Sequence, residues 1–415
     1  MTMPLRLRLL FFFFLTAALL APAQQLALHE GDRVAFYGDS ITAQRYYTRF
    51  VEDIFLTRYP RLRIAFFNAG VPGDTVNGGY TGDAPTRLRR DLFPRQPTVV
   101  TIMLGMNDGY YMPFNQKYLD IYENGYRALL NAIQTTLPAA RITLISPTPY
   151  DELTHGTEFP HYGQVVARHA AFVQELAASS HLSFCDFFTP VTDLTGAGMR
   201  ENPALAGLLV PDRIHPSEAA HWVMAAALAR SWNVSPIVSS VHLDAGPPSL
   251  IAAVNAGVSG LTLSAGTLQW TQTDDALPLP LDLNNGMIRF VLGISNLAAM
   301  DQQMLGVDHL TAARYTLKID NHAIAIFKRE ELAAGVNLAL YSTPMLSQAR
   351  DVDGDELERT ELDRANFILA IEDPKAPDAA GATKAIDEKN SILAEEQRKS
   401  AQPLPHVFEL VPETK

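Results

Sequence analysis

Cysteine is almost absent from this 415-residue chain, in which Cys185 is the only one. A single cysteine cannot form an intramolecular disulfide, so the fold must depend on its apolar core rather than on covalent cross-links. Hydrophobic residues make up 47% of the chain, which is ample for a large core and too many for a largely disordered protein. Cys185 lies in the apolar stretch LSFCDF, which is typical of a buried, inert thiol rather than a nucleophile.

Positive charge is also scarce. The chain has 33 Lys and Arg against 45 Asp and Glu, which gives a formal net charge of −12. Nucleic acids and anionic membrane surfaces attract basic proteins, so this balance argues against either of them as the main partner.

Long hydrophobic runs are rare, and the most prominent extends from Leu9 to Leu20. A bilayer span needs about 20 apolar residues, so this run is too short to serve as a stable membrane anchor. Two arginines precede it and small residues follow up to Ala23, which is the order found in a secretory signal peptide. We therefore expect residues 1–23 to be cleaved near Ala23 and the mature protein to be secreted or periplasmic.

The segment from Arg33 to about Ser231 alternates strand-like and helix-like stretches. Five short runs rich in Val, Ile and Phe are typical of strands covered on both faces. They are RVAFYG (33–38), RIAFFN (63–68), TVVTIML (98–104), RITLIS (141–146) and LSFCDF (182–187). Helical spacing predicts helices around 47–55, 118–136, 163–178 and 217–231. Such alternation predicts an α/β fold, with a parallel sheet wrapped by helices.

The remainder of the chain changes character after residue 235. Short alternating runs separated by Gly, Pro and Asn predict a β-rich module over 236–345, and IDNHAIA predicts a hairpin with a tight turn near Asn321. Residues 346–415 are strongly charged, which predicts a partly disordered or helical tail. The expected order is thus a signal peptide (1–23), an α/β domain (24–235), the β-rich module and the tail.

Two groups of potential metal ligands are weak candidates. Alternate aspartates at 351–355 have the spacing that opens a calcium loop, but Glu356 stands where glycine is needed and Leu362 where glutamate is needed. A solvated acidic turn is the better interpretation. His155 and His161 lack a convincing ligand set for zinc. We expect no metal ion and no other cofactor.

Polar residues and a glycine recur where the predicted strands end. Ser40 ends the first strand, Gly70 lies in the loop after the second, and Asn107 follows the third. Asp212 and His215 stand just before the last helix of the α/β segment. These positions open to the crevice in which α/β sheets bind ligands.

Each feature alone has an ordinary structural explanation. The Gly-Asp-Ser sequence at Ser40 can cap a helix, and both Gly70 and Asn107 can belong to simple turns. His215 and the proline after it can simply start a helix. Only their joint occurrence at one edge of the sheet points to chemistry.

Together these residue types fit ester cleavage. A serine hydroxyl becomes a nucleophile when a neutral histidine removes its proton, and a carboxylate can hold that imidazole in the right tautomer. Ser40, His215 and Asp212 can take these three roles. The resulting oxyanion needs fixed donors, which the Ser40 and Gly70 amides and the Asn107 side chain can supply.

The order and spacing of these residues resemble the SGNH, or GDSL, hydrolase family, which is named after a Ser, a Gly, an Asn and a His. They are matched here by Ser40, Gly70, Asn107 and His215. The first motif reads GDSI, with isoleucine in place of the frequent leucine, and the last reads DRIH. The resemblance covers roughly residues 33–232. It implies a three-layer, flavodoxin-like α/β/α sandwich with a five-stranded parallel sheet, and ester hydrolysis through an acyl-serine without metal.

The resemblance leaves the substrate open, because the family includes lipases, lysophospholipases, thioesterases and carbohydrate O-acetylesterases. The expected export and the appended β-rich module resemble secreted carbohydrate-active hydrolases, which favours a small acyl group, acetyl above all, on a glycan. A lipid esterase and an inactive glycan-binding protein on the same scaffold are the alternatives. Tyr110, Tyr111 and Tyr150 are candidates for the substrate rim, and packing beneath the loops is their alternative role. The sequence carries no signal for an oligomeric state.

Overall fold

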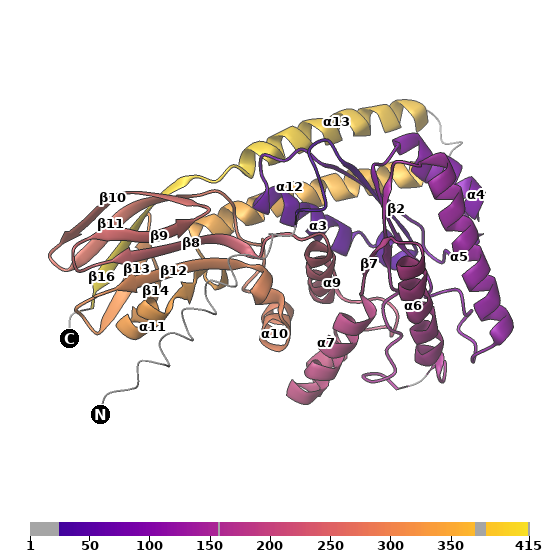
Figure 1. Ribbon diagram of the computed structural model, residues 1–415, viewed down its shortest axis with the longest axis horizontal. Helices are drawn as coiled ribbons and strands as arrows, with labels where there is room; N and C mark the ends of the chain where they lie inside the picture. The colour runs from indigo at the N-terminus through magenta and orange to yellow at the C-terminus, as the bar shows by residue number, and fades with distance from the viewer. Residues whose placement is uncertain (1–24, 157, 370–378, 414–415) are drawn as a thin grey trace.

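The computed structural model describes residues 25–156, 158–369 and 379–413. An α/β domain and a β-rich region lie side by side, and a pair of long helices extends from the second along the first (Figure 1). The predicted signal peptide lies outside the described residues. Among the helices in the described ranges, none combines the length and hydrophobicity needed to cross a membrane.

Five parallel strands form the central sheet of the α/β domain, in the order β2–β1–β5–β6–β7. Each coincides with a predicted strand to within a few residues, and the arrangement confirms the expected three-layer α/β fold. Their bounds are β1 Arg33–Gly38, β2 Ala65–Gly70, β5 Val99–Met103, β6 Arg141–Ile145 and β7 Ser183–Cys185. The short strands β3 (Gly78–Gly79) and β4 (Gly82–Asp83) form a separate two-stranded ladder.

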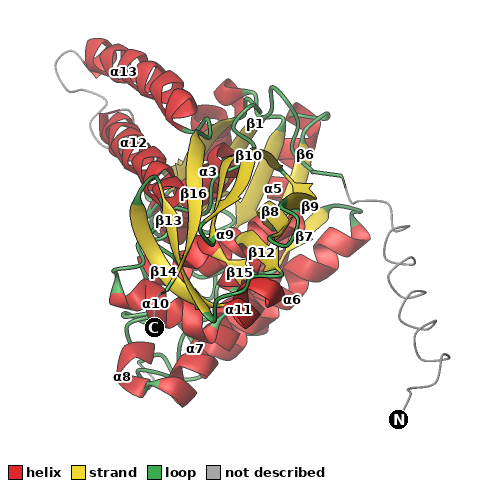
Figure 2. Ribbon diagram, turned by 90° about the vertical axis from the view of Figure 1, so that its left-hand side faces the viewer, coloured by secondary structure: helices red, strands yellow, loops and turns green. Residues whose placement is uncertain are grey.

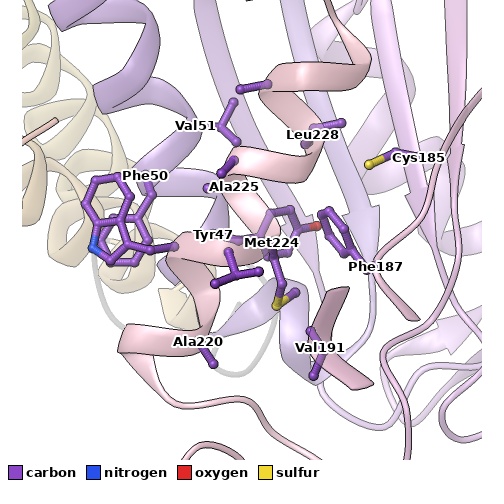
Figure 3. Packing of buried hydrophobic residues seen from close by; sticks show 14 of the residues in the cluster. Tyr47, Phe50, Val51, Cys185, Phe187, Val191, Ala220, Met224, Ala225 and Leu228 are labelled. Carbon is purple, nitrogen blue, oxygen red and sulfur yellow. The ribbon is translucent and has the colours of Figure 1, made fainter. Parts of the chain in front are cut away.

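Helices cover both faces of this sheet, because successive side chains of each strand point to opposite sides. Val34 and Phe36 of β1 belong to one buried cluster, and Ala35 and Tyr37 belong to the other. On the first face, α3 packs against α9 through interlocking apolar side chains (Figure 3). The principal helices are α3 (Tyr46–Arg58), α5 (Gln116–Thr136), α6 (Tyr162–Ser179), α7 (Phe188–Glu201) and α9 (Glu218–Ser231). Shorter ones are α2 (Ser40–Ala43), α4 (Ala84–Arg87), η2 (Leu88–Leu92), η3 (Phe93–Arg95) and α8 (Pro203–Ala206).

The strand order locates the crevice of the domain. The chain moves outward from β1 to β2 and then crosses back to β5 on the other side of β1. Ligands of open α/β sheets bind at such a reversal, beyond the carboxyl ends of the strands. Here the reversal lies between β1, which leads into Ser40, and β5, which leads into the loop containing Asn107.

The β-rich region consists of two sheets that enclose a separate core. One sheet has the order β15–β12–β8–β9 and the other β10–β11–β16–β13–β14. Their bounds are β8 Ile237–Asp244, β9 Ser249–Val254, β10 Ala256–Ser264, β11 Thr267–Asp274, β12 Gln302–Asp308, β13 Arg314–Ile319, β14 His322–Lys328, β15 Val336–Asn337 and β16 Pro405–Pro412. The predicted hairpin is confirmed, since β13 and β14 are joined by Asp320 and Asn321, which both have positive φ.

The β-rich region does not end at residue 345. Strand β16 lies in the segment expected to be a tail, yet it pairs with both β11 and β13. Phe408 and Leu410 of β16 belong to the core between the two sheets, and Phe408 stacks on Trp270. The module is therefore discontinuous in sequence, because a strand at the centre of one sheet comes from the end of the chain.

The two regions share buried contacts. The segment containing α10 (Gly286–Ile294) and η4 (Leu297–Met300) packs on the core of the α/β domain. At the end of α3, the buried Arg58 guanidinium pairs with Asp301 at 3.3 Å and donates to the Ser235 carbonyl at 2.5 Å. Smaller elements of the β-rich region are α11 (Arg329–Ala334) and η5 (Leu338–Leu340).

Two antiparallel helices connect β-rich elements across the α/β domain. They are α12 (Pro344–Phe367) and α13 (Ala379–Ser400), which lie beside each other at one flank (Figure 2). The alternate aspartates at 351–355 lie within α12, so they form neither a calcium loop nor an acidic turn. Instead Asp353 pairs with Arg49 of α3 at 3.2 Å, and Arg359 donates to Glu52 of α3 at 2.7 Å.

Candidate active site

Ser40 lies where β1 gives way to α2. Asp39 caps this short helix, because its carboxylate accepts a hydrogen bond from the Ile41 amide at 3.0 Å. Ser40 is thus the first helical residue, and its own N–H has no carbonyl partner within the helix. Burial of Asp39 raises its carboxyl pKa to about 7. The strand end therefore presents both the hydroxyl and the amide of Ser40 to the crevice.

His215 contacts Ser40 although 175 residues separate them along the chain. Its Nε2 lies 2.8 Å from the Ser40 hydroxyl oxygen, and its Nδ1 lies 2.6 Å from Oδ2 of Asp212. Because Nδ1 must donate to the carboxylate, Nε2 is left as the acceptor for the serine proton. The three residues form a continuous chain of hydrogen bonds.

A tight turn holds the carboxylate of Asp212 in place. Its Oδ1 accepts hydrogen bonds from the Ile214 amide at 3.0 Å and from the His215 amide at 2.7 Å. Partial burial raises the carboxyl pKa of Asp212, but these amides and the His215 ring together outweigh it and lower the pKa. The Asp212 side chain is 54% exposed, so its fixed position comes from these donors rather than from surrounding packing.

The loop after β5 is held through its backbone carbonyls. Tyr122 donates to the Leu104 carbonyl at 3.0 Å, and His169 Nδ1 donates to the Gly105 carbonyl at 2.7 Å. Tyr162 donates to the carbonyl of the next residue, Met106, at 2.6 Å. The three donors are buried side chains of α5 and α6. Three consecutive anchors leave little freedom for Asn107, which follows directly.

The side chain of Asn107 is fixed at both ends. Its Oδ1 accepts from the Tyr111 hydroxyl at 2.8 Å, and its Nδ2 donates to the Asp74 carbonyl at 2.9 Å. These contacts set the orientation of the amide and leave one N–H of Nδ2 for another acceptor. The neighbouring Asp108 reinforces the junction, since its buried carboxyl accepts from the Val76 amide at 2.9 Å. Loops 71–77 and 107–111 are thus tied together.

Gly70 differs from its expected role. It is the last residue of β2, and its N–H donates to the side-chain oxygen of Asn68 at 3.0 Å. A Cβ at this position would lie 2.4 Å from the Ala43 nitrogen, so glycine is needed here to let α2 approach the strand. The Gly70 amide is therefore already engaged, and packing explains its identity.

A second glycine in the same loop, Gly73, is an alternative candidate for an oxyanion donor. Residues 71–74 form a turn closed by the Asp74 amide donating to the Val71 carbonyl at 3.2 Å, with Gly73 at φ +74°. Proline before a glycine of positive φ is the signature of a type II turn, which leaves the glycine N–H outside the turn hydrogen bond. The carbonyl of the next residue, Asp74, accepts from the Asn107 side chain at 2.9 Å, so this turn is tied to Asn107. The Pro72-Gly73 pair was visible in the sequence and was missed.

The three candidate rim tyrosines separate into different environments. Tyr110 is 52% exposed and lies beside the Tyr118 ring, whereas Tyr111 is half-buried against Phe159. Both Tyr110 and Tyr111 have positive φ, which turns the loop sharply over the site. Tyr150 is only 4% exposed, because its ring packs among aromatic side chains. Tyr150 therefore supports the loop from beneath and does not line an open rim.

Potential metal ligands lie apart from one another in residues 25–156, 158–369 and 379–413. Within them, no three or more His, Cys, Asp or Glu side chains gather in a way that could hold a metal ion. His155 Nε2 donates to the Gly207 carbonyl at 2.7 Å.

The α/β domain is similar to known proteins. Residues 36–223 match the GDSL-like lipase/acylhydrolase family. The α/β domain belongs to this family. An acetylxylan esterase from Geobacillus stearothermophilus is 28% identical over 228 residues, which is 49% of this chain and 95% of the relative. The present protein, like other members of the GDSL-like family, is a serine ester hydrolase.

Solved structures extend the comparison beyond the GDSL-like domain. BT4096, a gut microbial diltiazem-metabolizing enzyme, superposes with a TM-score of 0.80 at 23% identity, over 93% of this chain and 98% of its own. That likeness shows that the α/β and β-rich regions occur together as one architecture in another protein. The crystal structure of Axe2, the acetylxylan esterase of G. stearothermophilus, gives a TM-score of 0.40 at 25% identity, over 50% of this chain and 96% of its own.

Proposed function

We propose that this protein is an exported esterase that removes short acyl groups, acetyl above all, from a carbohydrate. In this proposal Ser40 is the nucleophile, His215 is the general base and Asp212 orients the imidazole. The observation that carries it is the hydrogen-bonded series from Asp212 through His215 to the Ser40 hydroxyl, with distances of 2.6 and 2.8 Å.

The reaction follows from these contacts. Ser40 Oγ attacks the ester carbonyl carbon while its proton passes to Nε2 of His215. When the tetrahedral intermediate collapses, the C–O bond to the alcohol breaks, His215 returns the proton to that oxygen, and an acyl-serine remains. Water then attacks the acyl carbon with His215 again as base, and Ser40 leaves with a proton as the free acid is released. Asp212 stabilises the imidazolium formed in both halves.

Three N–H groups are proposed to stabilise the oxyanion: the Ser40 amide, the Gly73 amide and the remaining N–H of Asn107. Removing one such donor typically lowers kcat by about 10²–10³. Gly73→Ala is expected to lower kcat through the strained turn and displaced amide. Gly31→Ala is the matched control, because Gly31 also has positive φ (+81°) and open space around its Cβ. Equal kcat losses in both variants would remove Gly73 from the site.

A groove beside the catalytic loops supports a polymeric carbohydrate substrate. It holds about 650 Å³ between the loop after β2 and helix α5, and polar side chains of Asn77, Gln116 and Asn124 line it. Asn77, which lines the groove, follows three residues after Asp74, whose carbonyl accepts a hydrogen bond from Asn107. Amide groups both donate to and accept from sugar hydroxyls. Resemblance to an acetylxylan esterase points to the same substrate class.

A chain-length and substrate series tests the proposal. Purified protein and its Ser40→Ala variant are assayed on nitrophenyl acetate and dodecanoate, acetylated xylo-oligosaccharides and a lysophospholipid. We expect fast release of acetate from the first and third substrates by the parent protein alone. Preference for dodecanoate or lysophospholipid would replace the acetylesterase with a lipid esterase. Absence of hydrolysis together with retained oligosaccharide binding would make it a glycan-binding protein.

The groove has a test of its own. Asn124→Ala is expected to raise KM for acetylated xylo-oligosaccharides by about 5-fold, since it removes one exposed hydrogen-bonding amide, worth about 1 kcal/mol. The same variant should hydrolyse nitrophenyl acetate like the parent. An unchanged KM for the oligosaccharide would move the glycan elsewhere on the surface.

Export is proposed from the amino-terminal sequence. Expression with the native leader in a secreting host, followed by amino-terminal sequencing of the released protein, is expected to give a start near Gln24. Retention of the full-length chain inside the cell would contradict export.

A further inference from the structure

His221 lies in the core of the α/β domain, six residues after His215, on helix α9. It is completely buried. The proposed hydrolysis does not use it, and a buried histidine without a role in the chemistry has to be explained by its contacts.

Both ring nitrogens of His221 bind residues that follow Ser40. Nδ1 accepts from the Tyr47 amide at 3.1 Å, at the start of α3. Nε2 lies 3.2 Å from Oε1 of Gln44, the residue that ends α2. Because a backbone N–H can only donate, Nδ1 is the acceptor, so Nε2 carries the proton and donates to Gln44.

Gln44 in turn reaches the nucleophile. Its backbone amide donates to the Ser40 carbonyl at 2.8 Å, closing the single turn of α2. On the other side, the His221 amide donates to the carbonyl of Ser217, the cap of α9, which lies two residues after His215. A short series of hydrogen bonds thus connects the segment that carries Ser40 with the segment that carries His215.

The surroundings keep the His221 ring rigid and neutral. The Tyr47 ring stacks on it at 5.9 Å and 13°, and the Tyr46 ring meets it edge-on at 5.4 Å. Tyr47 itself is buried against α9 and Phe187 (Figure 3). Burial, and to a smaller extent the nearby His215, lower the pKa of His221 to about 3. The ring therefore keeps one tautomer over the pH range in which His215 must work.

We propose that His221 is a positioning residue that sets the separation between the Ser40 hydroxyl and the His215 ring, by binding Gln44 and the Tyr47 amide from helix α9. The proposal rests on Ser40 and His215 being the nucleophile and base. A rigid connection is useful here because these two groups come from distant segments, and a misplacement of about 1 Å can lower a catalysed rate about 10²-fold.

The test compares variants that remove one or both contacts. His221→Leu loses both, His221→Asn keeps an acceptor near the position of Nδ1 but cannot reach Gln44, and Gln44→Met removes the partner of Nε2. Each is assayed for kcat and KM on nitrophenyl acetate and for the rate at which a fluorophosphonate labels Ser40. That label reports the reactivity of the serine without the deacylation step.

We expect His221→Leu to lower kcat and the labelling rate together by about 10–100-fold at unchanged KM. Gln44→Met should lower both by less, and adding it to His221→Leu should cause little further loss, because both variants break the same connection. His221→Asn should recover part of the rate.

Leu228→Ala is the matched control, since Leu228 is fully buried on the same helix. It should lower Tm while keeping kcat and the labelling rate of the parent. If His221→Leu lowers Tm like the control but labels as fast as the parent, His221 is only a packing residue and the inference is wrong. If instead the Ser40→Ala variant still hydrolyses esters, the proposed function fails first.

Discussion

Two aspartates in this protein occupy opposite electrostatic environments. Asp212, in the catalytic loop, is half-exposed and receives three N–H donors, so its carboxyl pKa is lowered. Asp53, on α3, is completely buried, and among the described residues no N–H group donates to either of its carboxyl oxygens. Burial and the nearby carboxyl groups of Asp353 and Glu356 raise its pKa well above the usual value.

The two carboxyl pKa values shift in opposite directions because the two carboxyl groups differ in how many N–H donors surround them. At the catalytic loop, directed N–H groups stabilise one carboxylate in the ionised form that His215 needs. At the contact between α3 and α12, five carboxyl groups, three of them buried, face three arginines, so Asp53 is favoured in its neutral form. The first aspartate thus supports chemistry, while the second makes the stability of the α12 contact depend on pH.

The largest expected effect is at the nucleophile. Ser40→Ala removes the hydroxyl oxygen, so hydrolysis of nitrophenyl acetate should fall by about 10⁴-fold or more. The far-ultraviolet circular dichroism spectrum and Tm should stay those of the parent. Substantial turnover by this variant would show that the reacting group lies elsewhere.

Asp212→Asn should come next. The amide cannot stabilise the imidazolium and can favour the wrong tautomer of His215, while the oxyanion donors remain, so we expect kcat to fall by about 10³-fold with measurable residual activity. Steady-state kinetics on nitrophenyl acetate checks it. A rate equal to that of the parent would separate Asp212 from the catalytic group.

Tyr111→Phe tests the support of the oxyanion site. Removing the hydroxyl that binds Asn107 frees the side-chain amide to rotate, and we expect kcat to fall by about 10-fold at similar KM. Tyr118→Phe is a suitable comparison, because the Tyr118 ring packs beside Tyr110, and its kcat is expected to be near that of the parent. Equal rates in Tyr111→Phe and the parent would mean that Asp74 alone orients the amide.

The smallest effect is on stability, at Asp53. A carboxyl with a raised folded-state pKa destabilises the fold progressively as pH rises from the unfolded pKa, near 4, towards the folded pKa, because the unfolded chain releases its proton first. Asp53→Asn removes this loss. At pH 8 the Tm of Asp53→Asn should exceed that of the parent by roughly 2–4 °C for each kcal/mol of unfolding free energy that the variant regains. Near pH 4 the two proteins should have the same Tm.

Activity of Asp53→Asn should be unchanged, which separates it from the Asp212 variant. Glu175→Gln removes one carboxylate from an exposed position on α6 and should leave the pH dependence of Tm as in the parent. A pH-independent difference between Asp53→Asn and the parent would mean that Asp53 is ionised in the folded protein.

Local patterns in the sequence were sufficient to predict the α/β sheet and the contact between Ser40 and His215. Continuous apolar runs of four to seven residues specify buried parallel strands, and their carboxyl ends share one edge. The choice between Gly70 and Gly73 was harder, because it depends on the Asn68 side chain capturing one amide. In the sequence alone, only the Pro72-Gly73 pair, which is typical of a type II turn, distinguishes Gly73 from Gly70.

Strand β16 and helix α12 were not predictable in the same way. Residues 406–410 alternate between buried and more exposed positions in the sheet, but Val407 and Phe408 break any alternation of apolar and polar residue types. The partners β11 and β13 also lie far upstream, and local sequence does not reveal pairing over such distances. Helix α12 has charged residues on several sides, since its buried face binds α3 through ion pairs rather than through an apolar stripe alone. Composition therefore suggested a tail where the chain forms part of the core.

The central position of β16 has a consequence for biosynthesis. Strands β11 and β13 emerge from the ribosome well before β16, with the α12–α13 pair made in between. Until β16 has been made, two unfinished strand edges and the indole of Trp270 face water, so the sandwich can close only after β16 emerges, whereas the hydrolase domain is already whole. A chain shortened by its last ten residues would thus retain an assembled catalytic half beside an open, aggregation-prone half.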